Sequence, residues 1–425
     1  MSSGASFRRM LKRTAAILPT VCLVLLLAGC WGRNEAQSLD YVLAVGIDLN
    51  EDNDIVLTIQ TPVLDSLKQT GGSQGKETTK TVSIKGHSTY EAVRAYTNTV
   101  GKKLFWSHMQ VIVFSEQAVK FGVEPYLGYF ASDPRLRGTS YIAVVKGRAA
   151  DAIRLKPQFT LISSLHLHDV LEMGTFSGKY PLVRFSEFNR MLADPQGAQP
   201  YLPLVKLFPP GESNKQLKTV PNDELGTYRS PSFHAGGTVV FKATKFVGLL
   251  NESESRGLLW AKKDKLKSTV VVVPCKDNGG DHTCTISLNM IAPSKVNFHA
   301  RYEDGKAKLL LHVRANFDVG DKSSKHNTTT EAYSRYLENA FAEVVKKEIR
   351  SAFEKAVRSY HSDVFGFGND LEDRHPATWE KVKNDWEDRI LPNAELVVTV
   401  DAKLKQTSRN LYSPWVQPKK GSGDQ

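Results

Sequence analysis

The sequence predicts a multi-domain α+β protein, and three observations support this prediction. Short apolar runs alternate with helical patterns over residues 30–194, which is typical of a mixed α/β domain. Seven prolines then gather between residues 195 and 237, so we expect residues 195–250 to form a connector or a small irregular middle domain. Residues 251–406 contain four strand-like runs and then a long amphipathic helix. We expect these to form an antiparallel meander packed against that helix.

The first 29 residues have the layout of an export signal that ends at a lipid attachment site. Residues 1–13 carry four cations and no acidic residue, and residues 15–27 are apolar. This is the arrangement of a secretory signal peptide. The sequence LAGC, ending at Cys30, resembles a bacterial lipobox, in which the cysteine thiol receives a diacylglycerol and becomes the new N-terminus. A permanent membrane span is the alternative, but it needs about 20 apolar residues, and this shorter run contains Pro19.

The charge of the remaining chain excludes one class of partner. The formal net charge is +11, and four of the cations belong to the leader. In the rest of the chain cations and acids alternate, whereas a nucleic-acid-binding surface gathers Arg and Lys on one face. We therefore predict no nucleic-acid binding. The mild positive charge suits a protein held by two acyl chains at an anionic membrane surface.

The region 30–194 begins with a predicted hairpin of strands over 39–47 and 55–61, joined by the acidic turn 48–54. This turn lacks the ligand spacing of a calcium-binding EF-hand loop, so we expect it to be a solvated turn. A Gly- and Ser-rich stretch over 66–81 is predicted to be a flexible loop. The further predicted elements are strands over 82–85, 109–114 and 140–146 and helices over 88–99, with Ser88 as N-cap, 115–121 and 149–155.

The C-terminal region is predicted to be a sheet with one long helix. Its strands are predicted over 238–250, 269–274, 283–291, 295–302 and 307–319. Apolar side chains from Leu337 to Tyr360 recur on one helical stripe, which we expect to pack on the meander. A second helix over 377–387 and a last strand over 394–404 follow, and residues 407–425 are predicted to be a disordered tail.

Cys275 and Cys284 are the only cysteines beyond Cys30. They flank an Asn-Gly turn between two strand-like runs, which is typical of a hairpin. Export permits a disulfide between them. Two unpaired thiols and a metal site are the alternatives, and the metal site would need two more ligands where only His282 lies nearby.

The sequence contains no pattern that predicts catalysis or a cofactor. It lacks a phosphate-binding loop, a dinucleotide fingerprint and a paired-histidine zinc helix. The alternation of His166 and His168 would place both on one face of a strand, as a surface pair without a third ligand. His108 follows Ser107, but no acidic residue orients it, so we expect a turn residue. We predict no catalytic or metal-binding residues, and the ligand-binding residues stay unknown.

Four stretches together resemble the Ger(x)C family, the C-subunit lipoproteins of bacterial spore germinant receptors. They are CWGR from Cys30 with LDYVLAVGIDLNED from Leu39, then Lys102–Val123, Gly236–Trp260 and Tyr360–Asp388. The last is the most specific, because it combines DVFGFG with Trp379 and Trp386. Gly32 departs from the family pattern, where an acidic residue is usual.

This resemblance implies a non-enzymatic subunit, needed for spore germination in response to nutrients. It would lie on the outer face of the spore inner membrane, anchored through lipid on Cys30, beside membrane-embedded A and B subunits. In the segment Phe365–Gly368 we expect both glycines to permit positive φ and both phenylalanines to face the core. A solute-binding lipoprotein serving a transporter is the alternative function, but it would usually have two similar lobes, and the two halves here differ. An exported hydrolase lacks a nucleophile or metal motif.

Overall fold

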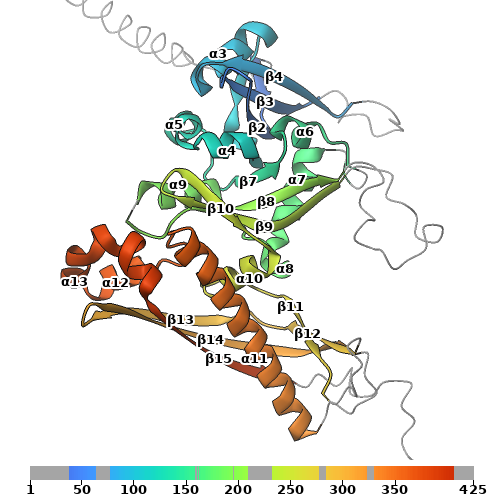
Figure 1. The fold of residues 1–425 in the computed structure, drawn as a ribbon. Coiled ribbons are helices and arrows are strands. Elements are labelled where there is room, and N and C mark those ends of the chain that lie inside the picture. Colours follow the sequence, from blue (N-terminus) through green and yellow to red (C-terminus); the bar gives the residue numbers. More distant parts are fainter. Residues whose placement is uncertain are drawn as a thin grey trace, which may run out of the picture.

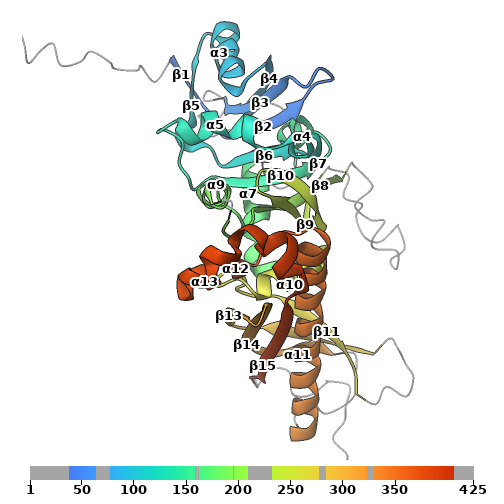
Figure 2. The same ribbon diagram turned by 60° about the vertical axis from the view of Figure 1, so that its left-hand side comes forward.

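The computed structural model describes residues 38–63, 77–157, 160, 162–194, 196–208, 232–276, 284–322 and 330–405. Two sheets follow one another along an elongated molecule, an eight-stranded sheet and a five-stranded sheet (Figures 1 and 2). Helix α10 (Glu252–Trp260) lies between them and contacts both halves. The predicted fold class, a mixed α/β half followed by a sheet packed on a long helix, is confirmed. In the described part of the chain, no helix is long and apolar enough to cross a membrane.

The N-terminal sheet has the strand order β10-β9-β8-β7-β6-β2-β3-β4. Its four central strands, β8, β7, β6 and β2, are parallel, and an antiparallel hairpin closes each edge. The strands are β2 (Ala44–Leu49), β3 (Ile55–Pro62), β4 (Thr79–Gly86), β6 (Val111–Ser115), β7 (Tyr141–Lys146), β8 (Tyr201–Phe208), β9 (Ser232–Lys242) and β10 (Lys245–Leu250). A separate pair joins β1 (Leu39–Tyr41) in parallel to β5 (Lys103–Phe105).

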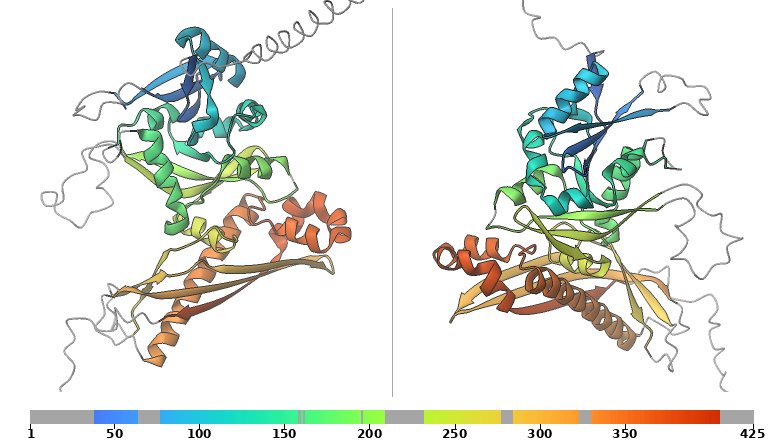
Figure 3. Two further views of the ribbon diagram at one scale, coloured as in Figure 1. Left: turned by 180° about the vertical axis from the view of Figure 1, so that it is seen from behind. Right: turned by 45° about the horizontal axis from the view of Figure 1, so that its top comes forward.

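The central strands are mainly apolar because helices cover both faces of the sheet. Every residue of β2 and β6 is buried. On one face, Ile112 and Phe114 pack in the same cluster as residues of α4 (Glu116–Phe121) and α5 (Glu124–Ser132). On the other face, Val111 and Val113 pack with α6 (Ala149–Arg154) and α7 (Ser163–Glu172) (Figure 3). The remaining helices of this half are α3 (Thr89–Val100), α8 (Gly174–Ser177) and α9 (Phe185–Ala193).

Helix α3 begins and ends where its sequence predicts. The Ser88 hydroxyl accepts a hydrogen bond from the Glu91 N–H at 3.1 Å, which confirms Ser88 as the N-cap. The helix ends at Gly101, whose φ of 76° is in the left-handed region that favours glycine.

Residues 195–250, expected to form a connector or a small domain, instead contribute three strands to the N-terminal sheet. The described residues of this range form β8, β9 and β10, and β8 pairs in parallel with β7. Pro203 lies within β8, at the register shift between β8 and β9. A proline is tolerated at such a bulge because the ladder is interrupted there. Both described prolines of this region therefore belong to the sheet, with Pro200 directly before β8 and Pro203 inside it.

The C-terminal sheet contains β11 (Val270–Pro274), β12 (Thr285–Met290), β13 (Lys295–Glu303), β14 (Lys306–Lys322) and β15 (Glu395–Leu404). The first four pair antiparallel, as predicted, but in the order β11-β12-β14-β13, so β12 is bonded to β14 and not to β13 as it would be in a meander. The final strand, β15, pairs in parallel with β14. Residues 308–314 of β14 pair with both β13 and β15, so β13 and β15 lie on opposite edges of β14. Buried and exposed residues alternate along β11, as expected where one face is covered.

Helix α11 (Glu331–Phe353) crosses the covered face of this sheet (Figure 1). Most of its predicted apolar stripe is buried, and Phe341 stacks on Phe317 of β14 with ring centroids 4.5 Å apart. The chain continues through the π-helix η4 (Glu354–Ser359), α12 (Phe367–Arg374), α13 (Pro376–Val382), η5 (Lys383–Asp385), η6 (Trp386–Ile390) and η7 (Leu391–Asn393). The predicted helix over 377–387 is thus divided among α13, η5 and the start of η6.

One apolar cluster joins the two halves. It contains residues of the N-terminal sheet such as Val45 and Phe241, residues of α10 such as Trp260, and residues of the C-terminal half such as Phe341 and Trp386. The two sheets therefore share a continuous core.

Candidate functional site

The segment Asp363–Gly368 lies where the C-terminal helices meet the N-terminal sheet, and a single carboxylate organises it. Asp363 is 1 % exposed. Its Oδ1 accepts hydrogen bonds from the N–H groups of Gly366 at 2.8 Å and Phe367 at 3.1 Å. Its Oδ2 accepts from the Gly368 N–H at 2.7 Å and from Trp386 Nε1 at 3.1 Å. Four donors therefore satisfy this buried charge.

The aromatic residues of the segment fill the space around this carboxylate. Phe365 and Phe367 are buried, as predicted, and their rings stack at 5.7 Å. Gly366 has the predicted positive φ, 81°. Gly368 does not: it lies inside α12, and a Cβ there would be 2.9 Å from Trp379 Cη2. Position 368 thus requires glycine because an indole ring packs against its backbone.

Hydrogen bonds connect this segment to the N-terminal sheet. The Gln199 N–H donates to the Asp363 carbonyl at 3.0 Å. The Ser362 hydroxyl donates to the carbonyl of Phe241, in β9, at 2.7 Å. Lys262, which follows α10, donates from Nζ to the Phe365 carbonyl at 3.1 Å. The segment is therefore bonded to the N-terminal sheet and to the chain after α10.

Two titratable groups beside Asp363 have pKa values close to neutrality. Burial, together with the nearby Asp363 charge, raises the pKa of Glu387 to about 7. Burial lowers the pKa of Lys262 to about 8, against the attraction of Asp363. Desolvation disfavours the charged form of each group. The junction can therefore gain or lose protons near pH 7.

A second polar cluster connects α10 to α11. The carboxylate of Glu348, which is 4 % exposed, accepts from Arg256 Nε at 2.9 Å and from Trp260 Nε1 at 3.0 Å. Gly257 lies at the closest approach of these helices, where a Cβ would be 2.1 Å from the Glu348 carbonyl oxygen. Together, the two clusters hold α10, α11 and the Asp363 segment in one arrangement.

The DVFGFG stretch, Trp379 and Trp386 gather at this junction, but the cysteines and histidines singled out in the sequence do not. Cys30 lies outside the described residues. Cys275 and Cys284 are joined by a disulfide, with Cα atoms 5.5 Å apart, and the Cys275 N–H donates to the Cys284 carbonyl. This bond connects the ends of β11 and β12, while the turn 277–283 lies outside the described residues.

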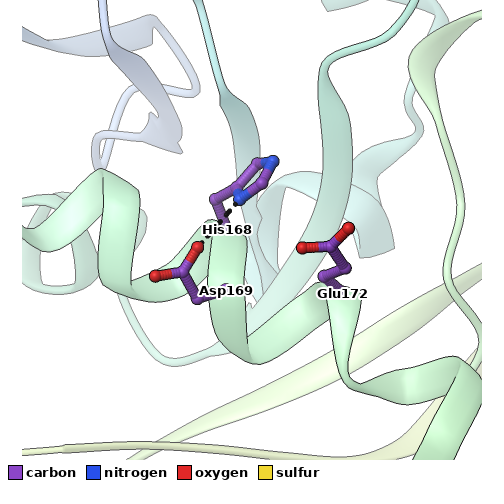
Figure 4. A group of neighbouring side chains, drawn as sticks. All are labelled: His168, Asp169 and Glu172. Atoms are coloured by element: carbon purple, nitrogen blue, oxygen red, sulfur yellow. Dashed lines mark hydrogen bonds and ion pairs between the residues drawn. The ribbon is translucent and has the colours of Figure 1, made fainter.

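The interpretation of His166 and His168 as a strand pair is wrong, because both lie in helix α7. Leu167 and Leu171, four residues apart, are its buried apolar positions, and this spacing is helical. His168, Asp169 and Glu172 form the only group of three metal-binding side chain types found close together in the described residues (Figure 4). Both carboxylates are exposed and all three come from one turn of α7, so this cluster is no more than a surface grouping.

Ser107 and His108 each contact a different residue. They lie in the 3₁₀-helix η3 (Trp106–His108), which agrees with the expected turn before β6. The Ser107 hydroxyl donates to the Arg135 carbonyl at 2.9 Å. The His108 ring packs against Tyr41, with centroids 5.5 Å apart.

The acidic turn 48–54 is less solvated than expected. Asp48 is buried at the end of β2, and its two carboxylate oxygens accept from the N–H groups of Ala149 and Ala150, each at 2.8 Å. Asp54 forms an ion pair with Lys85 at 2.7 Å. Asp54 also contacts the His87 ring and the Asn50 side-chain amide, so these carboxylates have protein partners.

Sequence reasoning missed four charged residues of the two clusters, which are Lys262, Glu387, Glu348 and Arg256. Each lies in a helix or turn whose sequence pattern is typical of a solvent-exposed segment. The family-like DVFGFG stretch was the one signal that pointed to this part of the chain.

Comparison with known proteins places two family models on this chain. Residues 32–207 match the model described as the spore germination protein N-terminal domain. Residues 236–408 match the model described as spore germination B3/GerAC like, C-terminal.

Similar proteins span almost the same length. Spore germination protein B3 of Bacillus subtilis (strain 168) is 24% identical over 90% of this chain and 95% of its own length. Spore germination protein KC of the same organism is 22% identical over 90% of this chain and 93% of its own length. The crystal structure of the GerBC protein aligns with a TM-score of 0.51 and 19% identity, over 85% of this chain and 97% of that one.

Proposed function

The chain belongs to the GerAC-like family of spore germination proteins, and we propose that it is the lipid-anchored C subunit of a nutrient germinant receptor. The observation that supports this most is the order and extent of the two family models. They begin two residues after Cys30 and together cover most of the chain that would remain after signal cleavage. The relatives are matched almost from end to end. We infer a role in assembly with membrane-embedded A and B subunits and no enzymatic activity.

Lipid on Cys30 would hold the N-terminal sheet close to the membrane. The described fold begins at Ser38, and eight residues of extended chain span at most about 30 Å. The five-stranded sheet lies at the other end of the molecule (Figure 2). In this orientation β1 and β5 face the bilayer and the receptor partners, while the C-terminal sheet projects away.

Substitution of the lipobox cysteine tests the anchor. Cys30→Ala should abolish labelling with radioactive fatty acid and release the protein from the membrane fraction. Cys22→Ala, in the apolar run of the leader, is the matched control and should leave both properties unchanged. Labelling that persists in Cys30→Ala would refute lipidation at this residue.

Deletion of the gene tests the receptor role. Spores that lack the protein should germinate more slowly with one class of nutrient, measured as the fall in optical density with a panel of amino acids and sugars. Reintroduction of the wild-type gene should restore the rate, and the Cys30→Ala gene should restore less. Normal germination with every nutrient, in a strain without paralogues, would refute the role.

The architecture gives little support to the alternative function, a solute-binding lipoprotein that serves a transporter. Such a protein usually has two similar α/β lobes with the ligand between them. Here an eight-stranded mixed sheet is followed by a five-stranded sheet with one long helix. Tight binding of a sugar or amino acid by the mature chain, measured by calorimetry, would favour this alternative.

A further inference from the structure

We propose that a pocket between the N-terminal sheet and the start of α10 binds a small amphipathic carboxylate, an apolar chain or ring that ends in one carboxylate group. The pocket has a volume of about 670 Å³, which lies within the usual range for ligand sites. It opens at the carboxyl ends of the parallel strands β7 and β8, and this edge of an α/β sheet commonly holds ligands.

The floor of the pocket is apolar and comes from four neighbouring strands. Val144 of β7, Leu204 of β8 and Val239 of β9 are buried at its base, while Phe246 and Leu249 of β10 remain half-buried. An apolar ligand would cover the exposed parts of the β10 side chains, and the removal of this surface from water favours binding.

Two lysines stand side by side at the rim. Lys146 of β7 and Lys206 of β8 are register partners in the parallel pair, and both line the pocket. Each follows its strand's floor residue, Val144 or Leu204, by two positions, so it lies on the same face of the sheet. Neither lysine forms an ion pair with any residue in the described part of the chain. Like charges placed directly opposite are destabilising, and an anion bound between them would relieve this repulsion.

The other charged groups of the pocket are already paired. Glu116 pairs with Lys120 at 2.7 Å. Glu252 pairs with Lys179 and with His234, each at 3.0 Å. The third lysine of the lining, Lys355 of η4, pairs with Glu254 at 2.9 Å. The unbalanced charge of the pocket is therefore the positive charge of Lys146 and Lys206.

An amphipathic monoanion complements both features. Its carboxylate would accept charge-assisted hydrogen bonds from the two ammonium groups, while its apolar body would lie on the β10 side chains. A neutral hydrocarbon would leave the two lysines repelling each other. A sugar has too little apolar surface to cover the apolar floor of the pocket. This inference depends on the pocket alone and stands apart from the receptor role.

Calorimetry with the mature chain, carrying Cys30→Ser to keep it unlipidated, tests the proposal with octanoate as the probe. We expect saturable 1:1 binding of octanoate and at least tenfold weaker binding of octan-1-ol and of L-leucine. Lys206→Met keeps the apolar stem of the lysine, so the fold should persist, as checked by circular dichroism. This variant should bind octanoate at least tenfold more weakly while its affinity for octan-1-ol stays within twofold.

Lys295→Met is the matched control. Lys295 is an exposed lysine of β13 that also stands opposite a cation, Arg314, but lies outside the pocket. Its substitution removes the same charge and should change octanoate affinity by less than twofold. Absence of saturable octanoate binding to the parent protein would overturn the proposal. Equal affinity for octan-1-ol or for L-leucine, or equal weakening by Lys295→Met, would overturn it as well.

Discussion

Replacement of Asp363 by asparagine is the most direct test of how the junction is held together. The carboxylate offers two oxygens to four donors, whereas the asparagine amide would offer one oxygen and one NH₂ group. In either amide orientation two donors lose their acceptor, either the Gly366 and Phe367 N–H groups or the Gly368 N–H and Trp386 Nε1. A hydrogen bond to a charged group contributes about 1.5–3 kcal/mol. We expect Asp363→Asn to lower the free energy of unfolding by about 3–5 kcal/mol.

Guanidinium denaturation followed by tryptophan fluorescence measures this change, because the Trp386 indole is itself one of the four donors. The matched control is Asp373→Asn on α12, an exposed carboxylate, which should change stability by less than about 0.5 kcal/mol. A loss below about 1 kcal/mol in Asp363→Asn would mean that water or a rearranged loop replaces these hydrogen bonds. The interpretation of Asp363 as the organising group would then be wrong.

Three further changes test other parts of the structure. Burial raises the pKa of Glu387 to about 7, so the folded chain binds this proton more tightly than the unfolded chain, and stability should fall by about 3 kcal/mol as the pH rises from about 4.5 to about 7. Glu387→Gln should remove this fall in pH-dependent denaturation, and an unchanged pH dependence would contradict the assignment. Gly257→Ala should cost about 3 kcal/mol in chemical denaturation by pushing α10 away from α11, whereas Gly128→Ala, in α5 with open space around its Cβ, should add about 0.5–1 kcal/mol. A neutral Gly257→Ala would show that the helices can separate freely. Replacement of both Cys275 and Cys284 by serine should cost about 2–3 kcal/mol, and an intact mass with two free thiols in the parent protein would rule out the bond.

Much of the fold could be predicted because burial leaves a local pattern in the sequence. Strands β2, β6 and β7 are mainly apolar runs, since both of their faces are covered. Helix α11 shows its apolar stripe for 23 residues. The hairpin signal between Cys275 and Cys284 likewise agrees with the antiparallel pairing of β11 and β12.

The errors concern features that depend on distant partners. Residues 195–250 contain many prolines, and the sequence alone does not show that Pro203 lies at a bulge next to β9. Alternation in a short segment is compatible with a strand or with a helix, so the pattern of His166 and His168 predicts the wrong element. Positive φ does not explain Gly368, whose real constraint is Trp379, a residue of the next helix.

The candidate site could be located by one specific stretch, but its chemistry was not predictable. Lys262 and Glu387 come from distant segments of the chain, and each is flanked by charged residues typical of a solvated surface. Their burial exists only after both halves have folded against Asp363. No local sequence pattern predicts this burial.

The apolar cluster that runs through both sheets has a consequence for how the protein moves and how it can be divided. A flexible hinge needs a plane with few contacts, and the cluster crosses the plane between the sheets. If the N-terminal half tilted, the C-terminal sheet would therefore move with it as one rigid body. For the same reason, halves expressed separately would each present a cut apolar face to water and would be prone to aggregate.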